Sequence, residues 1–409
     1  MRALAAVFLL FQSAAAEAAE LRPRDPLARA YAFLYEQMDR QARARLRLPQ
    51  SYVSTPTFSN GDFSYIYDDD VLIVTLLARS SPDDVAHARA LGDTLLYLQA
   101  HDPAHDGRVR DAYHVEWLTR GGAAAIANNA SHTGNLAWTA LAFAQLYRAT
   151  NDARYLTGAL HLARFVQENF YDPRGIGGYT GGIEANGAKI RYKSTEHNID
   201  LYALFTILGQ LTHDAVWHAR AGQALKMISA MWSGKRGFFW IGTGLDGQSV
   251  NKLDPIPEDV QTWSLLALGS VQYGSSVDWA LANLSAADGP FRGLSFAAID
   301  RSGVWFEGTA HAAAALRARH GRRDTAAASL LLAGIEHAQA SAPNADGRGI
   351  VAASKDGLRT GDGQNDRYNA ALHIAATAWY CLAKLSANPF RLLPTRMRFK
   401  SIPLPRVVP

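Results

Sequence analysis

Acidic residues open several long apolar runs of this sequence, and pairs of carboxylic acids can cleave glycosidic bonds. Glu196 lies within the segment STEHNID, Glu307 within VWFEGTAH, and Asp69 within a run of three aspartates. Glycoside hydrolysis requires one protonated acid for the leaving oxygen and one carboxylate that activates water or attacks the sugar carbon. Glu196, Glu307 and Asp69 are therefore the predicted catalytic residues. Neighbouring acids should raise the pKa of Glu196, which makes it the first choice for general acid, with Glu307 or Asp69 as base.

Aromatic, amide and imidazole side chains accompany these acids. Sugar rings stack on aromatic planes, and their hydroxyls bind to Asn, His and carboxylate groups. The helix dipole also stabilises an acid at the start of a helix, so each single acid has a purely structural explanation. Their recurrence favours ligand binding. The predicted substrate-binding residues are Asp68, Tyr67, His132, Asn135, His197, Asp200, Trp240, Asp259 and Trp305.

Metal ions and organic cofactors are not expected. Cys381 is the only cysteine, which excludes an internal disulfide and a site built from several thiolates. The glycine-rich stretch 175–187 follows no strand pattern and lacks the spacing of a phosphate-binding loop. Four histidines occur one per repeat, and structural roles explain them better than metal binding. They are His132, His197, His311 and His373.

The acidic and polar clusters recur about every sixty residues, each at the start of an apolar run with helical character. The gaps between successive clusters are 65, 63, 62, 49 and 61 residues, measured between Asp69, Gly134, His197, Asp259, Gly308 and Asn369. Such a length accommodates two helices and two connections. The six runs are apolar nearly all round, which is typical of helices buried on every side.

Amphipathic helices with capping residues alternate with the buried ones. Residues 81–84 (SPDD) supply a cap, a first-turn proline and two acids, and Asn151-Asp152 opens another helix. An N-terminal amphipathic helix at 26–46 brings the total to twelve. Six buried helices inside six amphipathic ones predict an all-α fold, the (α/α)6 toroid. An open solenoid of helical hairpins is the alternative, but it would require polar terminal repeats. Further amphipathic helices are expected at 213–232, around 279–281 and at 324–340.

Loop lengths indicate which rim of the toroid carries the site. Connections from a buried to an amphipathic helix are short, as at Ser80-Ser81, whereas the return connections are long, as at 171–193 and 342–367. All long loops therefore fall at the N-termini of the buried helices, beside the acidic clusters. Long loops on a rigid scaffold commonly carry function.

The chain ends predict export and a basic tail. Residues 1–19 combine Arg2, a short apolar run and alanine-rich cleavage options, as in a cleaved signal peptide. The run is too short to span a bilayer, and no later segment reaches about 20 uninterrupted apolar residues. We expect a periplasmic or secreted monomer with one toroid domain at 22–390 and a tail at 391–409. The net charge of +4 is concentrated in that tail, so no nucleic-acid partner is expected.

The repeat and three of its motifs resemble the six-hairpin glycosidase-like superfamily, in particular secreted bacterial members. The motifs are STEHNID (194–200), PEDVQTW (257–263) and VWFEGTAH (304–311). The resemblance extends over nearly all of the mature chain at the level of fold. It implies a polysaccharide or oligosaccharide substrate, such as an exopolysaccharide or β-glucan, and hydrolysis by an acid pair without a metal, mostly with inversion. It assigns neither the sugar nor the role of each acid.

Three other functions remain open on the sequence. A polysaccharide lyase would use a Tyr or His base, for which His132, His197 and Tyr192 are available, but a lyase cleft for polyanions requires Arg and Lys where these clusters are acidic. An epimerase of the same fold works through paired histidines on cytosolic substrates, which conflicts with export. A non-catalytic sugar-binding protein of an exopolysaccharide system would retain the aromatic residues without requiring two acids.

Overall fold

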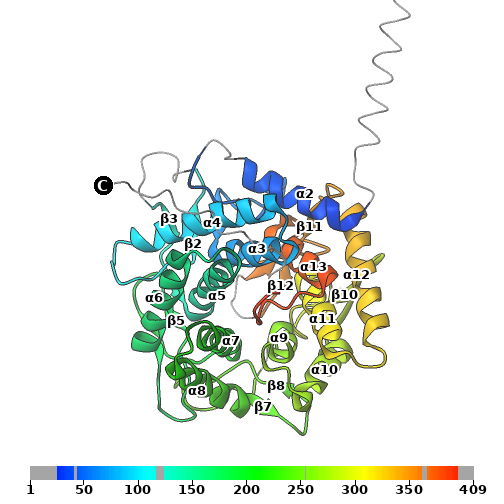
Figure 1. The fold of residues 1–409 in the computed structure, drawn as a ribbon. Coiled ribbons are helices and arrows are strands. Elements are labelled where there is room, and N and C mark those ends of the chain that lie inside the picture. The colour runs from blue at the N-terminus through cyan, green and yellow to red at the C-terminus, as the bar shows by residue number, and fades with distance from the viewer. Residues whose placement is uncertain (1–24, 41–43, 117–123, 254, 362–365, 395–409) are drawn as a thin grey trace, which may run out of the picture.

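Twelve helices make up most of the chain that the computed structural model describes, namely residues 25–40, 44–116, 124–253, 255–361 and 366–394. The predicted signal peptide and most of the basic tail lie outside these residues. Six helices form a closed inner ring, because each packs against the next and the last packs against the first (Figure 1). These inner helices are α3 (Ile66–Arg79), α5 (Thr133–Thr150), α7 (Thr195–Thr212), α9 (Glu258–Leu268), α11 (Phe306–Arg319) and α13 (Ile374–Leu385).

The other six helices surround this ring, so the (α/α)6 toroid predicted from the repeat is confirmed. The N-terminal helix α2 packs against α13 and thereby pairs the two ends of the described chain. It ends at Asp39, earlier than the predicted residue 46. The outer helices are α2 (Pro26–Asp39), α4 (Pro82–Ala100), α6 (Ala153–Phe170), α8 (Ala215–Met231), α10 (Ser275–Asn283) and α12 (Asp324–Ser341).

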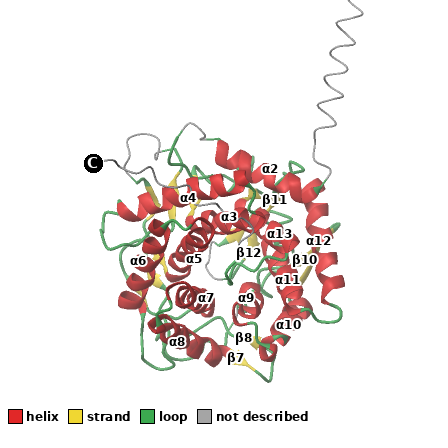
Figure 2. Ribbon diagram, viewed as in Figure 1, coloured by secondary structure: helices red, strands yellow, loops and turns green. Residues whose placement is uncertain are grey.

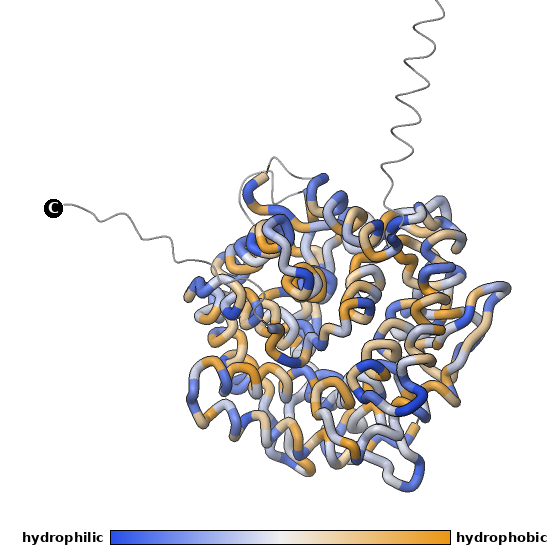
Figure 3. Tube along the Cα trace, turned by 45° about the vertical axis from the view of Figure 1, so that its right-hand side comes forward, coloured by the Kyte–Doolittle hydropathy of each residue, from blue (hydrophilic) through white to orange (hydrophobic). Residues whose placement is uncertain are grey.

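Local sequence explains why the outer helices form where they do. Hydrophobic and hydrophilic residues alternate along the outer helices in Figure 3, as expected for helices with one buried face. At the start of α4, Ser81 and Asp84 form a capping box, and the buried Asp84 carboxylate also binds Arg79 and Tyr35. No helix of the described residues combines the length and the apolar character that a bilayer span requires.

Sharp turns end all six inner helices at a residue with left-handed backbone conformation. Only one of these is glycine, although glycine is the residue that adopts this conformation without strain. After each of the first five inner helices the turn returns the chain to the outer ring, which keeps this end of the toroid short of loops. The six residues are Ser80, Asn151, His213, Gly269, His320 and Ser386.

The opposite end carries long loops that contain short strands, which the sequence analysis did not predict (Figure 2). For example, β1 (Phe63–Tyr65), β2 (Ala112–His114) and β3 (Ile126–Asn128) form a three-stranded sheet beside the start of α3. These strands fix the loops at the rim where the inner helices begin. The remaining strands are β4 (Ser131–His132), β5 (Gly182–Ile183), β6 (Lys189–Ile190), β7 (Trp232–Ser233), β8 (Phe238–Phe239), β9 (Ser285–Asp288), β10 (Phe291–Leu294), β11 (Ile350–Val351), β12 (Leu358–Arg359), β13 (Arg367–Tyr368) and β14 (Leu372–His373).

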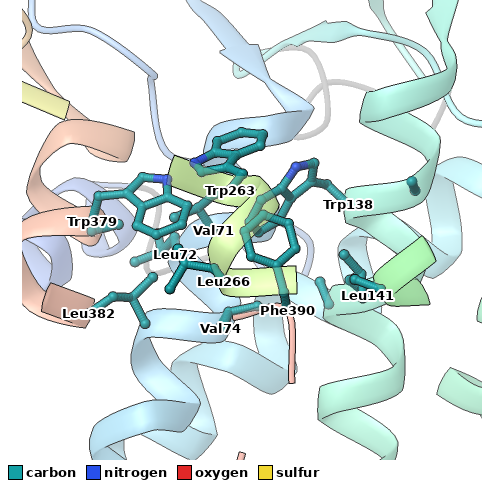
Figure 4. Packing of buried hydrophobic residues seen from close by; sticks show 14 of the residues in the cluster. Val71, Leu72, Val74, Trp138, Leu141, Trp263, Leu266, Trp379, Leu382 and Phe390 are labelled. Carbon is teal, nitrogen blue, oxygen red and sulfur yellow. The ribbon is translucent and has the colours of Figure 1, made fainter. Parts of the chain in front are cut away.

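The segment after α13 closes the centre of the ring from the side without long loops. Phe390 is buried against Trp138, Trp263 and Trp379, with ring centroids 5.2, 5.4 and 6.4 Å away (Figure 4). Gln145 on α5 fixes this segment by bonding to the backbone of its residues 391 and 393. Phe390, the last residue of the predicted toroid domain, therefore belongs to the core.

We expect Phe390→Ala to lower the free energy of unfolding by about 3–5 kcal/mol, because it leaves a cavity among three rigid indole rings. Urea unfolding followed by circular dichroism measures this loss. Val271→Ala is the control, since Val271 is 97% exposed. A loss no larger than that of the control would show that Phe390 does not close the ring in solution.

Candidate active site

A cavity of about 450 Å³ opens among the N-termini of the inner helices. Aromatic and acidic side chains from widely separated parts of the chain form its walls. The acids are Asp111, Glu196, Asp259, Glu307 and Asp366. The aromatic residues are Tyr65, Tyr67, Trp138, Trp263, Phe296, Trp305 and Tyr368. The rim predicted from loop lengths is thus where the structure has a cavity of suitable chemistry.

Glu307, in the first turn of α11, is a carboxylate of this cavity that neighbouring side chains hold in place. The Tyr67 hydroxyl donates to its Oε1 at 2.8 Å, and the Trp379 indole N–H donates to that hydroxyl at 2.8 Å. Two imidazoles flank the carboxylate: His311 Nε2 lies 3.6 Å from Oε1, and His373 Nδ1 lies 3.6 Å from Oε2. Tyr67 and Glu307 are 240 residues apart, so ring closure brings this cluster together.

A second layer of carboxylates holds the two imidazoles. His311 Nδ1 lies 3.2 Å from Glu258 Oε2, and His373 Nε2 lies 3.3 Å from Asp68 Oδ1. Tyr52 stacks on the His373 ring at a centroid distance of 4.0 Å. Carboxylates and imidazoles therefore alternate along a buried chain of five groups centred on Glu307.

This arrangement determines the charge of the central groups. Burial opposes ionisation of Glu307, but the adjacent imidazoles of His311 and His373 outweigh it and lower the pKa of Glu307 below its ordinary value. Burial likewise disfavours the charged imidazole, yet Glu258 and Glu307 raise the pKa of His311 from 6.5 to about 9. Near neutral pH, Glu307 is a carboxylate beside a cationic His311.

We expect His311 to give the fold a pH-dependent stability. Its pKa is higher in the folded protein than in the unfolded chain, so its contribution is complete below about pH 6.5 and is lost as the pH rises towards about 9. The difference in unfolding free energy between wild type and His311→Gln should therefore shrink over that range, as measured by urea unfolding. Taking this difference cancels the titration of groups common to both proteins. A constant difference would contradict the assigned charge.

Glu196 and Asp259 supply acids on other parts of the cavity wall. Glu196 lies in the first turn of α7 and Asp259 in the first turn of α9. Asp200 lies behind them, where burial and the charge of Asp259 raise the pKa of its carboxyl well above the ordinary value. Gly134 allows α5 to approach α7 here, because a Cβ at this position would lie 2.6 Å from His197.

Asp111 and His132 form an ion pair at the edge of the cavity. Asp111 accepts from the backbone N–H and the Nδ1 of His132. Burial opposes the charge of His132, but Asp111 raises its pKa above the ordinary value. The neighbouring His197 is neutral, because burial lowers its pKa to about 3. Asn135 lines the cavity beside this pair, as its predicted role in substrate binding requires.

The structure does not place every predicted residue in the cavity. Asp69 is fully buried, and its two carboxylate oxygens share the single Ser64 hydroxyl proton, at oxygen–oxygen distances of 2.9 and 3.0 Å, so a catalytic role for Asp69 is not supported. Asp68 lies behind Glu307, against His373. Trp240 packs against Phe238 instead of lining the cavity.

Several residues of the site were not predicted. His311 and His373 were interpreted as scattered structural histidines, and Glu258 and Tyr368 were not singled out. One signal was available, since His311 follows Glu307 by four residues and so lies on the same face of a helix. Among the described residues, no group of three or more His, Cys, Asp or Glu has the arrangement of a metal site.

Comparison with known proteins identifies the fold. No family model matches the sequence, and no curated protein matches it significantly. Similar solved structures include a sugar epimerase from a ruminal bacterium, with a TM-score of 0.64 and 11% identity over 87% of this chain and 95% of that one. A cellobiose 2-epimerase from Bacillus thermoamylovorans B4167 gives a TM-score of 0.62 at 11% identity over 87% and 99%.

Hydrolases occur among the similar structures as well. A family 76 glycoside hydrolase from a bovine Bacteroides thetaiotaomicron strain gives a TM-score of 0.61 at 12% identity, covering 88% of this chain and 77% of that one. At identities this low, the TM-scores show a shared toroid fold and no more than that. They confirm, at the level of fold, the resemblance to six-hairpin glycosidase-like proteins.

Proposed function

We propose that this chain is a carbohydrate-active enzyme and, more specifically, a glycoside hydrolase. The observation that carries the proposal is Glu307, a carboxylate kept ionised between two imidazoles in a cavity lined by aromatic rings and further acids. Sugar-processing enzymes among the proteins of the same fold support the coarser part of the proposal.

Glu307 is suited to the role of base. In the proposed reaction its carboxylate takes a proton from a water molecule while the water oxygen attacks the anomeric carbon. At the same time a protonated acid delivers its proton to the glycosidic oxygen, and the bond from that oxygen to the anomeric carbon breaks. Glu196 is our first candidate for this acid and Asp259 the second, since both line the cavity with Glu307.

A sugar epimerase is the second candidate, because the similar structures include sugar epimerases. Proton exchange at a sugar carbon by two histidines requires both imidazoles at the substrate. Here His311 lines the cavity, whereas His373 lies behind Glu307 and is covered by Tyr52. His311 is also cationic near neutral pH, which disfavours a role as base. Hydrolysis therefore fits the arrangement better.

A substrate panel distinguishes these reactions. The purified protein is incubated with neutral β-glucans, α-mannans, bacterial exopolysaccharides and uronic-acid polymers. We expect new reducing ends with at least one neutral polymer. Absorbance near 235 nm would instead indicate a lyase. A changed sugar composition without new reducing ends would indicate an epimerase. Binding without any of these changes would indicate the non-catalytic sugar-binding function.

We further expect inversion at the anomeric carbon. Inverting enzymes hold their two carboxyl groups roughly 6.5–9.5 Å apart, with space for water, whereas retaining enzymes need about 5–5.5 Å. Proton NMR of the first product formed shows its anomeric configuration directly. A product with the configuration of the substrate would overturn the assignment of Glu307 as a base acting on water.

Export remains part of the proposal, since residues 1–19 lie outside the described chain. Expression of the full sequence in a bacterium, followed by N-terminal sequencing of the periplasmic and extracellular protein, tests it. Cleavage after one of the alanines at 14–18 is the expected result, and an intact cytoplasmic protein would contradict it.

A further inference from the structure

We infer that the indole N–H groups of Trp263 and Trp305 donate hydrogen bonds to hydroxyl oxygens of the bound sugar. This inference rests on the proposed function, whose site it extends with two residues that recognise the substrate. Both rings line the cavity, and they are 3% and 2% exposed. Neither Nε1 has a hydrogen-bond partner among the residues that the structure describes.

Unpartnered buried donors are uncommon, because burial without a hydrogen bond is costly. Trp379, also at the centre of the ring, differs in this respect, because it donates to the Tyr67 hydroxyl at 2.8 Å. The Nε1 of Trp138 also lacks a hydrogen-bond partner, but it interacts with the carboxyl of Asp200, which is a protein acceptor. Trp263 and Trp305 are therefore the cavity-lining indoles for which the described residues provide no protein acceptor.

Neighbouring groups hold the Trp305 ring in place and cover its faces. Tyr368 stacks on it at a centroid distance of 5.2 Å and an angle of 26°. At Gly308, an added Cβ would lie 2.2 Å from the Trp305 ring, so only glycine allows the helix to pack against it. Because these groups occupy the ring faces, the indole edge with its N–H remains for a ligand.

Trp263 is held in a similar way within a cluster of aromatic rings. Trp379 stacks against it at 5.8 Å and 19°, Tyr67 lies tilted at 6.1 Å, and Phe390 packs at 5.4 Å. Rotation towards a protein acceptor would disrupt this packing. The cluster thus keeps a donor available in the cavity.

The two donors lie beside the proposed catalytic base. Both indole rings contact the His311 ring, at centroid distances of 5.1 and 5.3 Å, and His311 lies next to Glu307. A sugar hydroxyl can donate to a carboxylate and accept from an N–H at the same time. Fixed N–H donors next to a carboxylate therefore select a sugar with free hydroxyls at the ring that undergoes cleavage.

Nuclear magnetic resonance tests the inference without relying on turnover. The protein contains nine tryptophans, so its ¹H–¹⁵N spectrum resolves a small set of indole signals. Neutral hexasaccharides of β-1,4-glucose, β-1,3-glucose and α-linked mannose are added at millimolar concentration to the Glu307→Gln protein, which is expected not to consume them. With a sugar that binds, we expect the Trp263 and Trp305 signals to shift downfield and to exchange more slowly with water, while the Trp379 signal changes little.

Two outcomes would overturn the inference, and they differ in what they imply for hydrolysis. In the first, a sugar shifts backbone amide signals at the cavity, which shows binding, but moves neither indole signal. This result would overturn the inference and leave the proposed function standing. Absence of binding by every hexasaccharide would count against the inference and the proposed function together.

Phenylalanine variants give a second measurement. Trp263→Phe and Trp305→Phe retain an aromatic ring and lose the N–H, and each should weaken sugar binding about tenfold, as expected for one lost hydrogen bond. Trp217→Phe, on the outer helix α8, is the matched control and should bind with the wild-type dissociation constant. A deoxy sugar that lacks the accepting hydroxyl should bind wild type and variant equally. Wild-type affinity in both cavity variants would overturn the inference.

Discussion

Glu307→Gln is expected to abolish most hydrolytic activity, with a loss of about 100-fold or more in kcat. An amide cannot take the proton from the attacking water, and general-base catalysis contributes about 10²–10⁴-fold to such reactions. The substitution preserves side-chain size and the possibility of a hydrogen bond with Tyr67. Initial rates of reducing-end release, together with substrate affinity and circular dichroism, separate lost chemistry from lost binding or folding.

The control for this substitution is Asp83→Asn, on the exposed first turn of α4. It removes a carboxylate without touching the cavity and should leave kcat unchanged. The neighbouring Asp84 does not serve as a control. Its carboxylate is buried against Arg79, Ser81 and Tyr35, so its loss would destabilise the fold. Wild-type turnover by a folded Glu307→Gln protein would exclude Glu307 as the base.

Glu196→Gln is expected to lower activity on polysaccharide by a similar factor, about 100-fold or more, if Glu196 protonates the leaving oxygen. The loss should depend on the substrate. An aryl glycoside whose phenol leaves as an anion requires no protonation, so the variant should retain most of the wild-type rate on it. Rates on a polysaccharide and on a nitrophenyl glycoside of the same sugar measure this dependence.

Asp259→Asn is the matched comparison, because Asp259 lines the same cavity from the neighbouring inner helix. If this variant, and not Glu196→Gln, shows the leaving-group dependence, then Asp259 is the general acid. Equal losses on both substrates in both variants would exclude both residues as the general acid.

Local sequence patterns were sufficient to predict the architecture. Two features recur along the chain at intervals near sixty residues, namely a buried run of one helix length and a capped amphipathic partner. Both depend on residues that are close together in sequence. The helix α10 shows how far this extends, since it lies in the shortest of the five gaps, 49 residues, and has only nine residues. Loop lengths also identified the rim that carries the cavity.

The identity of the site residues required the tertiary structure. Successive helix residues point about 100° apart, so Asp68, Asp69 and Asp70 cannot all face the same neighbour. In the ring, Asp68 faces His373, Asp69 bonds to Ser64, and Asp70 accepts from Thr139 of α5 at 2.7 Å. Nothing near these aspartates in sequence specifies the rotation of α3 about its axis, because that rotation is set by packing against α5 and α13.

Long-range contacts determined the rest of the site in the same way. Tyr67 and Glu307 meet across 240 residues, and Phe390 supports Trp138 and Trp263 from the segment that follows the last inner helix. The sequence by itself determined the helices, their order and the acidic end of the toroid, because hydrophobic periodicity and capping act within a few residues. Only the closed ring decided which acid faces the cavity and which imidazole holds it, because those contacts exist only after distant helices pack together.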